Sequence, residues 1–172
     1  PVSKWLERVS ESELCQILKT YANERYAKKI ARAIWQKQQM EPITTTLSLA
    51  KLVAEQVPYH GQTIHPATKT FQALRMVINQ EVEEIESFLD AVLPLLAPKG
   101  RFIALTFHGV ETRLVRRFIQ THTPGNEVGD LQGKAPKASP LKRMKKLKPS
   151  AHEIKHNSRA RSAMAFVVEK IV

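Results

Sequence analysis

The sequence predicts an α/β fold that is mostly helical, with two or three strands. Apolar residues recur at helical spacing over most of the chain. Two short apolar runs, 101–107 and 163–172, are typical of buried strands. A chain of 172 residues, 42% hydrophobic and 25% charged, is long enough for one good core or two small ones.

Residues 1–58 are predicted to form short helices. Ser10 and Glu13 make a capping box at the start of the first long one. Pro42 ends the second, Thr46 is expected to cap the third, and Pro58 closes it. The apolar residues expected on the inner faces of these helices are Leu14, Ile17, Leu18, Tyr21, Tyr26, Ile30, Ala33, Ile34, Leu49, Leu52 and Val53.

The helical period then continues from 66 to 97 for over six turns, which predicts one long helix that Pro94 kinks or ends. A turn at 98–100 precedes the strand at 101–107, and a helix is expected over 110–119. Residues 123–140 are rich in Pro, Gly, Ser and Lys without any period, which indicates a loop.

Two apolar strands among long amphipathic helices cannot cover both faces and both edges of a sheet. Strands this apolar are typical of the interior of a larger parallel or mixed sheet. We therefore expect the missing strands to come from outside this chain, or the chain to associate with itself.

The positive charge is concentrated in one stretch. Residues 133–161 hold ten Lys or Arg and one acid, Glu153, and so carry +9 of the net charge of +11. Such a field attracts polyphosphate backbones. The alternative is a solvated basic tail without a specific partner.

The only cysteine, Cys15, has neither a CxxC partner nor a nearby His pair, so we expect no disulfide framework and no metal site. No apolar run approaches the roughly 18 residues that span a bilayer, and the N-terminus lacks the layout of a signal peptide. The expected location is the cytoplasm, without a membrane partner.

Several segments together resemble one family. Residues 95–102 are similar to the turn before the fifth strand of class I methyltransferases. The other matching segments, in family order, are 20–34, 42–46, 65–75 with Asn79 and Glu81, 106–108 with Glu111 and Arg113, and 157–162. Over essentially all of its length the chain resembles bacterial MraW-type rRNA cytosine-N4 methyltransferases.

The resemblance implies a class I (Rossmann-like) fold with a helical substrate-recognition insertion, and S-adenosylmethionine-dependent methylation of a cytidine amine in small-subunit rRNA. The chain would be the incomplete, C-terminal part of that fold. Residues 1–64 would belong to the insertion, 65–122 to the methyltransferase domain, 123–156 to a basic loop or linker, and 157–172 to the terminal strand of the sheet.

The family's Gly-rich turn and the acid that binds the donor's ribose lie upstream of the matched segments. None of the six glycines here forms a G-x-G pattern, so we expect no cofactor-binding residues in this chain and no activity of the chain alone. The expected partners are small-subunit rRNA or a 30S-like particle, and a separate cofactor-binding half.

The chain also departs from the family's motifs. Gly109 and Thr112 stand where the family usually has Ser and Asp, Ser158 replaces a Pro, and Phe166 replaces a basic residue. These changes fall in the motifs expected to face the active site. The alternative function is a noncatalytic basic RNA-binding or ribosome-associated protein derived from the fold.

His108 is the candidate catalytic residue, because it follows a predicted strand and ligand sites in open α/β sheets lie at strand carboxyl ends. The alternative is a structural His that caps the next helix. Other residues expected to face the substrate, each with a turn, ion-pair or solvent-facing role as its alternative, are His65, Arg75, Asn79, Glu111, Arg113 and Asn157.

Two groups of cations are candidates for RNA binding. Arg159 and Arg161 lie in a matched motif, and guanidinium groups suit both phosphate and base contacts. The second group is expected to provide electrostatic attraction without sequence recognition, and consists of Lys142, Arg143, Lys145, Lys146 and Lys148.

Overall fold

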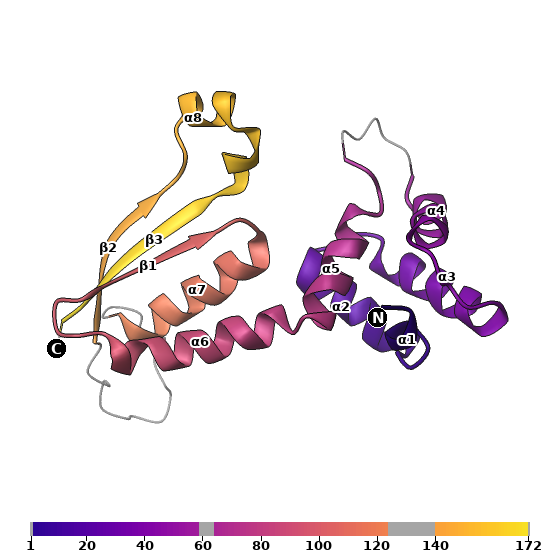
Figure 1. The fold of residues 1–172 in the computed structure, drawn as a ribbon, viewed down its shortest axis with the longest axis horizontal. Coiled ribbons are helices and arrows are strands. Elements are labelled where there is room, and N and C mark those ends of the chain that lie inside the picture. The colour runs from indigo at the N-terminus through magenta and orange to yellow at the C-terminus, as the bar shows by residue number, and fades with distance from the viewer. Residues whose placement is uncertain (1, 59–63, 124–139, 172) are drawn as a thin grey trace, which may run out of the picture. The chain divides into compact units, whose positions relative to one another are not determined.

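The computed structural model describes residues 2–58, 64–123 and 140–171. The chain divides into two compact units, Pro1–Val82 and Glu83–Val172. The described residues form eight α-helices, one 3-10 helix and one three-stranded antiparallel sheet, which confirms the mostly helical α/β class (Figure 1).

The first unit is helical. Its elements are α1 (Val2–Leu6), α2 (Glu11–Ala22), α3 (Ala27–Met40), α4 (Thr46–Gln56) and α5 (Thr68–Ile78). α2 packs against α3 and α5, and α3 packs against α4. The predicted apolar stripes supply the core, in which Leu14, Leu18, Ile30 and Val53 are fully buried.

Two of the predicted helix starts are visible at atomic detail. The Ser10 hydroxyl accepts a hydrogen bond from the Glu13 amide at 3.2 Å, which confirms the cap of α2. The cap of α4 is Thr45, whose hydroxyl accepts from the Ser48 amide at 3.1 Å, so the prediction of Thr46 was wrong by one residue. Either threonine satisfies the sequence pattern, because both precede the apolar stripe.

The long helix predicted over 66–97 is two helices, α5 and α6 (Glu81–Leu95). The first of them ends at Ile78 with Asn79 as its C-cap, and Gln80 adopts a left-handed conformation with φ of 53°. The Arg75 guanidinium donates two hydrogen bonds to the Glu81 carboxylate across the break, at 2.8 and 3.0 Å. The apolar period runs on through the break, so periodicity could not reveal it.

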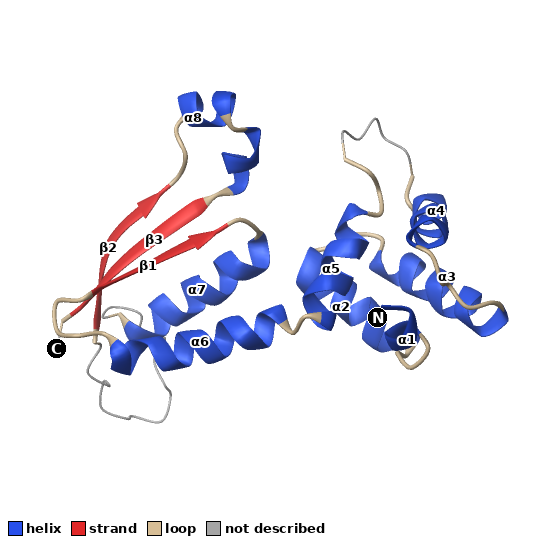
Figure 2. Ribbon diagram, in the orientation of Figure 1, coloured by secondary structure: helices blue, strands red, loops and turns tan. Residues whose placement is uncertain are grey.

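The second unit contains the sheet, built from β1 (Arg101–Thr106), β2 (Leu141–Leu147) and β3 (Met164–Lys170) in the order β1-β3-β2. Figure 2 shows α6 and α7 (Gly109–His122) on one side of the strands. The inward side chains of the sheet, among them Phe102 and Val168, are buried there. The Phe102 ring lies 6.1 Å from Phe88 of α6 and 6.0 Å from Phe118 of α7, centroid to centroid.

A lysine of β3 ties the sheet to the end of α6. The Lys170 ammonium donates to the carbonyl oxygens of Leu96 at 2.7 Å and Leu93 at 3.3 Å. These carbonyls belong to the last turn, where no amide of the helix remains to bond them. The turn between α6 and β1 is the predicted one: Lys99 has a φ of 62°, and a Cβ on Gly100 would stand 2.7 Å from the Ala97 carbonyl oxygen.

On the other face of the sheet the apolar side chains of β1 are exposed. Ile103 and Leu105 of β1 are 64% and 58% exposed, and β1 pairs with β3 alone. The interior position expected for this strand is therefore not reached within the described part of the chain.

The segment 141–156 was expected from the family resemblance to belong to a basic loop or linker over 123–156, but it forms regular structure. It contains β2 and then α8 (Ala151–His156), while the rest of the expected loop, 124–139, lies outside the described residues. Leu-Lys-Arg-Met-Lys-Lys-Leu has no β-branched residue and no apolar alternation, so strand propensity is absent from it. The backbone of β3 supplies the pairing partner instead.

Candidate functional site

The strand order brings distant segments to one edge of the sheet. β1 and β2 both run antiparallel to β3 and are therefore parallel to each other, with their carboxyl ends at the same edge. His108 follows β1 at this edge, and the connection containing α8 and the 3-10 helix η1 (Ser158–Ser162) joins β2 to β3 there (Figure 1). This carboxyl edge is where ligands bind in open α/β sheets.

Glu111 organises the start of α7 at the carboxyl edge. Its Oε2 accepts hydrogen bonds from the backbone amides of Phe107 at 2.7 Å and His108 at 3.4 Å. Its Oε1 lies 2.9 Å from Nε2 of His108. A carboxylate in the first turn also interacts favourably with the helix dipole.

His108 occupies the N-cap position of α7, as its alternative structural role requires. The contact with Glu111 lacks hydrogen-bond geometry, and both ring nitrogens are buried without a hydrogen-bond partner among the described residues. A buried polar group without a partner needs an explanation, and a catalytic role is one of the recognised ones. The capping position and a chemical role are compatible.

Two threonines that are not among the predicted site residues lie next to each other where β1 meets α7. Thr106 is 2% exposed, and its hydroxyl lies 2.8 Å from that of Thr112. The Thr106 hydroxyl also donates to the Met164 carbonyl at 3.2 Å, which links the end of β1 to the start of β3. A six-residue spacing of threonines is no recognised sequence signal, so only the fold reveals this pair.

The connection 157–162 is held by its own cap. The Asn157 side chain accepts from the Arg159 amide at 3.2 Å, and Ala160 is buried at 6% exposure. Arg159 and Arg161 are exposed. Asn157 therefore has a structural role, and the two guanidinium groups remain available at the edge where His108 lies.

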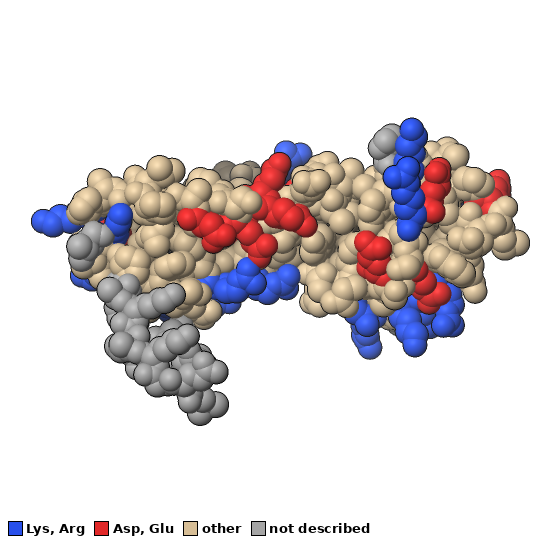
Figure 3. All heavy atoms as spheres, turned by 90° about the horizontal axis from the view of Figure 1, so that it is seen from below, with Lys and Arg blue, Asp and Glu red and all other residues tan. Residues whose placement is uncertain are grey.

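The other predicted cations lie along the edge strand β2 or directly after it. All five, Lys142, Arg143, Lys145, Lys146 and Lys148, are exposed. Acidic side chains gather on the face shown in Figure 3. On α6, Glu83, Glu84 and Asp90 are exposed. Lysines on an edge strand also discourage pairing with another sheet.

Three candidates lie in the first unit and make local contacts. The His65 ring accepts a hydrogen bond from the Ala67 amide at 3.1 Å, as a turn residue does. Arg75 is paired with Glu81, and the Asn79 amide lies 3.4 Å from the same carboxylate. Arg113, in the second unit, is exposed on α7. A substrate contact by any of these four stays a prediction.

Two features of the described residues bear on nucleotide and metal binding, namely the glycines and the groups of possible metal ligands. The two described glycines are Gly100, which a tight turn requires, and Gly109, around which no atom lies within 4 Å of an added Cβ. Within the described ranges no three His, Cys, Asp or Glu side chains gather as a metal site, and no helix is long and apolar enough to cross a membrane.

Replacing Glu111 with Ala tests the role of its carboxylate. We expect a loss of about 1 kcal/mol in unfolding free energy. Two backbone amides lose their hydrogen-bond acceptor, and the N-terminus of the helix loses a favourable negative charge. Glu111→Gln, which retains an acceptor oxygen, should lose less. Urea denaturation followed by circular dichroism measures this, with the exposed Gln120→Ala on the same helix as the control. Equal stability of Glu111→Ala and the control would contradict the role.

Residues 2–171 match the MraW methylase family. The match spans both compact units and includes Glu111 at the start of α7, the lysine-rich strand β2 (the basic strand) and the 157–162 connection. It agrees with the resemblance inferred from the sequence motifs. The chain therefore belongs to the MraW methylase family.

Proposed function

We propose that this chain is the RNA-facing and C-terminal part of an enzyme that transfers a methyl group from S-adenosylmethionine to the N4 amine of a cytidine in small-subunit rRNA. The observation that carries the proposal is the family match over residues 2–171. At the family level it implies S-adenosylmethionine-dependent methylation of rRNA. We propose in addition that the methylated base is a cytidine and that this chain contacts the RNA while another part of the enzyme binds the methyl donor.

The chemistry requires positioning above all. The lone pair of a cytosine amine is delocalised into the ring, so the amine must be held in line with the methyl group. Its proton must leave as the bond forms, and His108 is the residue we propose to assist. Its support is its position at the carboxyl edge beside Glu111, with both ring nitrogens lacking hydrogen bonds among the described residues.

The uncovered sheet face supports the expectation of a partner half. An apolar face with Ile103 and Leu105 more than half exposed is costly in water. We propose that strands and helices of the donor-binding part pack beside β1 and over this face, and that they supply the pocket for S-adenosylmethionine.

A noncatalytic RNA-binding protein is the second candidate, and the corner around Thr106 favours it. Thr112 stands where the family usually has an acid, and its hydroxyl is engaged by Thr106 at 2.8 Å. Gly109 replaces a hydroxyl residue although a Cβ would meet nothing there within 4 Å. Compared with the usual family residues, position 112 has lost a carboxylate, and position 109 has lost a hydroxyl for which the structure has space.

Neutralising the basic strand tests RNA binding. With all five candidates Lys142, Arg143, Lys145, Lys146 and Lys148 changed to Gln, affinity for a single-stranded rRNA fragment should fall. The slope of log K against log salt should become shallower by about 0.7 for each phosphate that the protein no longer neutralises. Fluorescence anisotropy across a salt series measures both.

The matched control for that experiment removes five exposed cations of the first unit, namely Lys4, Lys19, Lys28, Lys29 and Lys51, each changed to Gln. It has the same change in net charge. An unchanged slope for the basic-strand variant, or an equal change in both variants, would contradict the proposed role of the strand.

The 172-residue chain alone should not bind S-adenosylmethionine, because it has no Gly-rich turn to hold the donor. Isothermal titration calorimetry should give no heat beyond dilution. Stoichiometric binding would overturn the assignment of the donor site to another part of the enzyme. Titration with a single-stranded rRNA fragment is the positive control for folded protein.

Methyl transfer in the presence of a family donor-binding half tests His108. His108→Gln should lower the rate on the order of 100-fold, which is typical for removal of a general base. RNA affinity should not change. Gly109→Ser restores the residue that the family usually has at this position. If the missing hydroxyl limits catalysis, this variant should raise the rate of methyl transfer. No methyl transfer by the reconstituted pair, despite RNA binding, would favour the noncatalytic alternative.

A further inference from the structure

A small cleft lies within the second unit, between α7 and the edge strand β2. Its volume is about 240 Å³. The floor is apolar and comes from Ile119, Phe166 and Val168, which are 5%, 7% and 1% exposed. Arg116, Arg143 and Lys146 line it with exposed, positively charged side chains.

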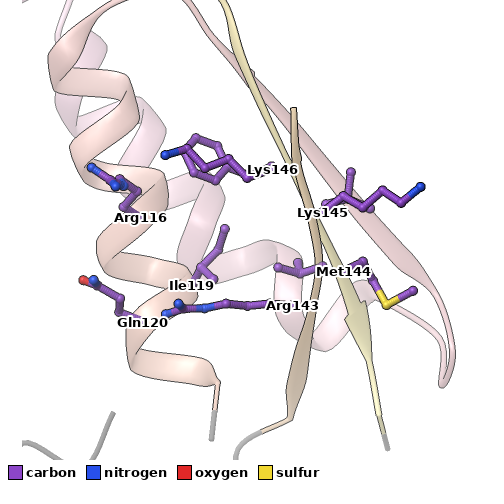
Figure 4. A pocket seen from close by; sticks show the side chains of 10 residues that line it. Arg116, Ile119, Gln120, Arg143, Met144, Lys145 and Lys146 are labelled. Carbon is purple, nitrogen blue, oxygen red and sulfur yellow. The ribbon is translucent and has the colours of Figure 1, made fainter. Parts of the chain in front are cut away.

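A β-bulge determines which cations of β2 point into the cleft. Arg143 pairs with Val168, Lys145 with Val167 and Lys146 with Phe166, so Met144 is the extra residue. In a regular strand Arg143 would share its face with Lys145. The extra residue places Lys146 on that face instead. Figure 4 shows Arg143 and Lys146 directed toward α7, and Met144 and Lys145 directed away.

The charges of the cleft are not balanced by carboxylates. None of the side chains that line it is acidic. Arg116, Arg143 and Lys146 form no ion pair with any carboxylate of the described residues, whereas neighbouring Arg117 is paired with Glu86 of α6. Arg116 and Arg117 differ by about 100° around the helix, which separates the binding face from the structural one.

Three cations that line one cleft from a helix and a strand are suited in charge to a phosphate chain. Guanidinium groups bind phosphate oxygens through two parallel hydrogen bonds. The cleft is smaller than the roughly 300 Å³ at which pockets for whole small molecules begin. It therefore suits one or two backbone phosphates of an open strand better than an enclosed cofactor.

We infer that this cleft binds the phosphodiester backbone of a single RNA strand, with Arg116, Arg143 and Lys146 as the contacts. The inference rests on the proposed RNA-binding function and names the cations that perform it. Arg116 lies seven residues along α7 from Gly109, about 10 Å at 1.5 Å per residue. A strand held in the cleft thus runs beside the carboxyl edge, where His108 lies, and backbone contacts of this kind position an RNA without recognising its sequence.

The test compares two charge-matched double variants on the same strand. Arg143→Gln with Lys146→Gln removes the cations directed toward α7. Lys142→Gln with Lys145→Gln removes one cation that does not line the cleft and one that borders it but is directed away from α7.

For a fluorescent single-stranded RNA in about 0.1 M salt, we expect the first pair to weaken binding about 20-fold and to make the salt slope shallower by about 1.4. The second pair should weaken binding by less than about threefold, because its cations attract RNA only through the general field. Arg116→Gln added to the first pair should weaken binding further.

Equal losses of affinity in the two double variants would overturn the inference that the cleft binds the RNA backbone. General RNA binding by the basic strand would still stand. No loss in either would overturn both proposals. Circular dichroism checks that each variant is folded. As a measurement without substitutions, hydrogen exchange of the unaltered chain should show RNA-dependent protection in peptides covering 114–120 and 141–147, and its absence would also overturn the cleft.

Discussion

The central position of β3 is the constraint on which the second unit depends. Antiparallel pairing on both sides forces β1 and β2 to be parallel to each other, although 34 residues of sequence lie between Thr106 and Leu141. Backbone hydrogen bonds of β3 also hold β2 as a strand, despite its unfavourable composition. Without this pairing the basic segment would have no fixed face, and His108 would not share an edge with the connection 157–162.

At the start of α7, hydrogen bonds connect the end of β1, the first turn of the helix and the start of β3. Glu111 bonds the amides that end β1 and contacts His108, while Thr106 bonds both Thr112 and the first residue of β3. Each of these bonds joins elements that converge at the carboxyl edge. Together they hold the backbone where β1 passes into α7, the position that His108 occupies.

The cations of the second unit fall into two groups, those that form ion pairs within the protein and those that line the cleft between α7 and β2. Arg117 pairs with Glu86 between α7 and α6, and Arg101 pairs with Glu169 between β1 and β3. These pairs join elements at exposed positions, where they contribute little to stability. Arg116, Arg143 and Lys146 have no such pairing with described carboxylates and converge on an apolar floor. A cation that serves no internal pair and is aimed into a cleft is suited to an external anion.

The sequence by itself determined the local elements, because their signals are local. Helical period predicted α2, α3 and α7, the apolar run predicted β1, and the Ser10 box located a helix start. Motif order also indicated the family. The tertiary structure alone decided the break at Asn79 and Gln80, since the apolar period continues through it. Gln is also not a residue type that indicates a left-handed backbone conformation, as Gly would. It alone decided β2 and its bulge, because an edge strand of lysines forms through the backbone of its neighbour, and the partner of a strand cannot be read from the strand's own residues.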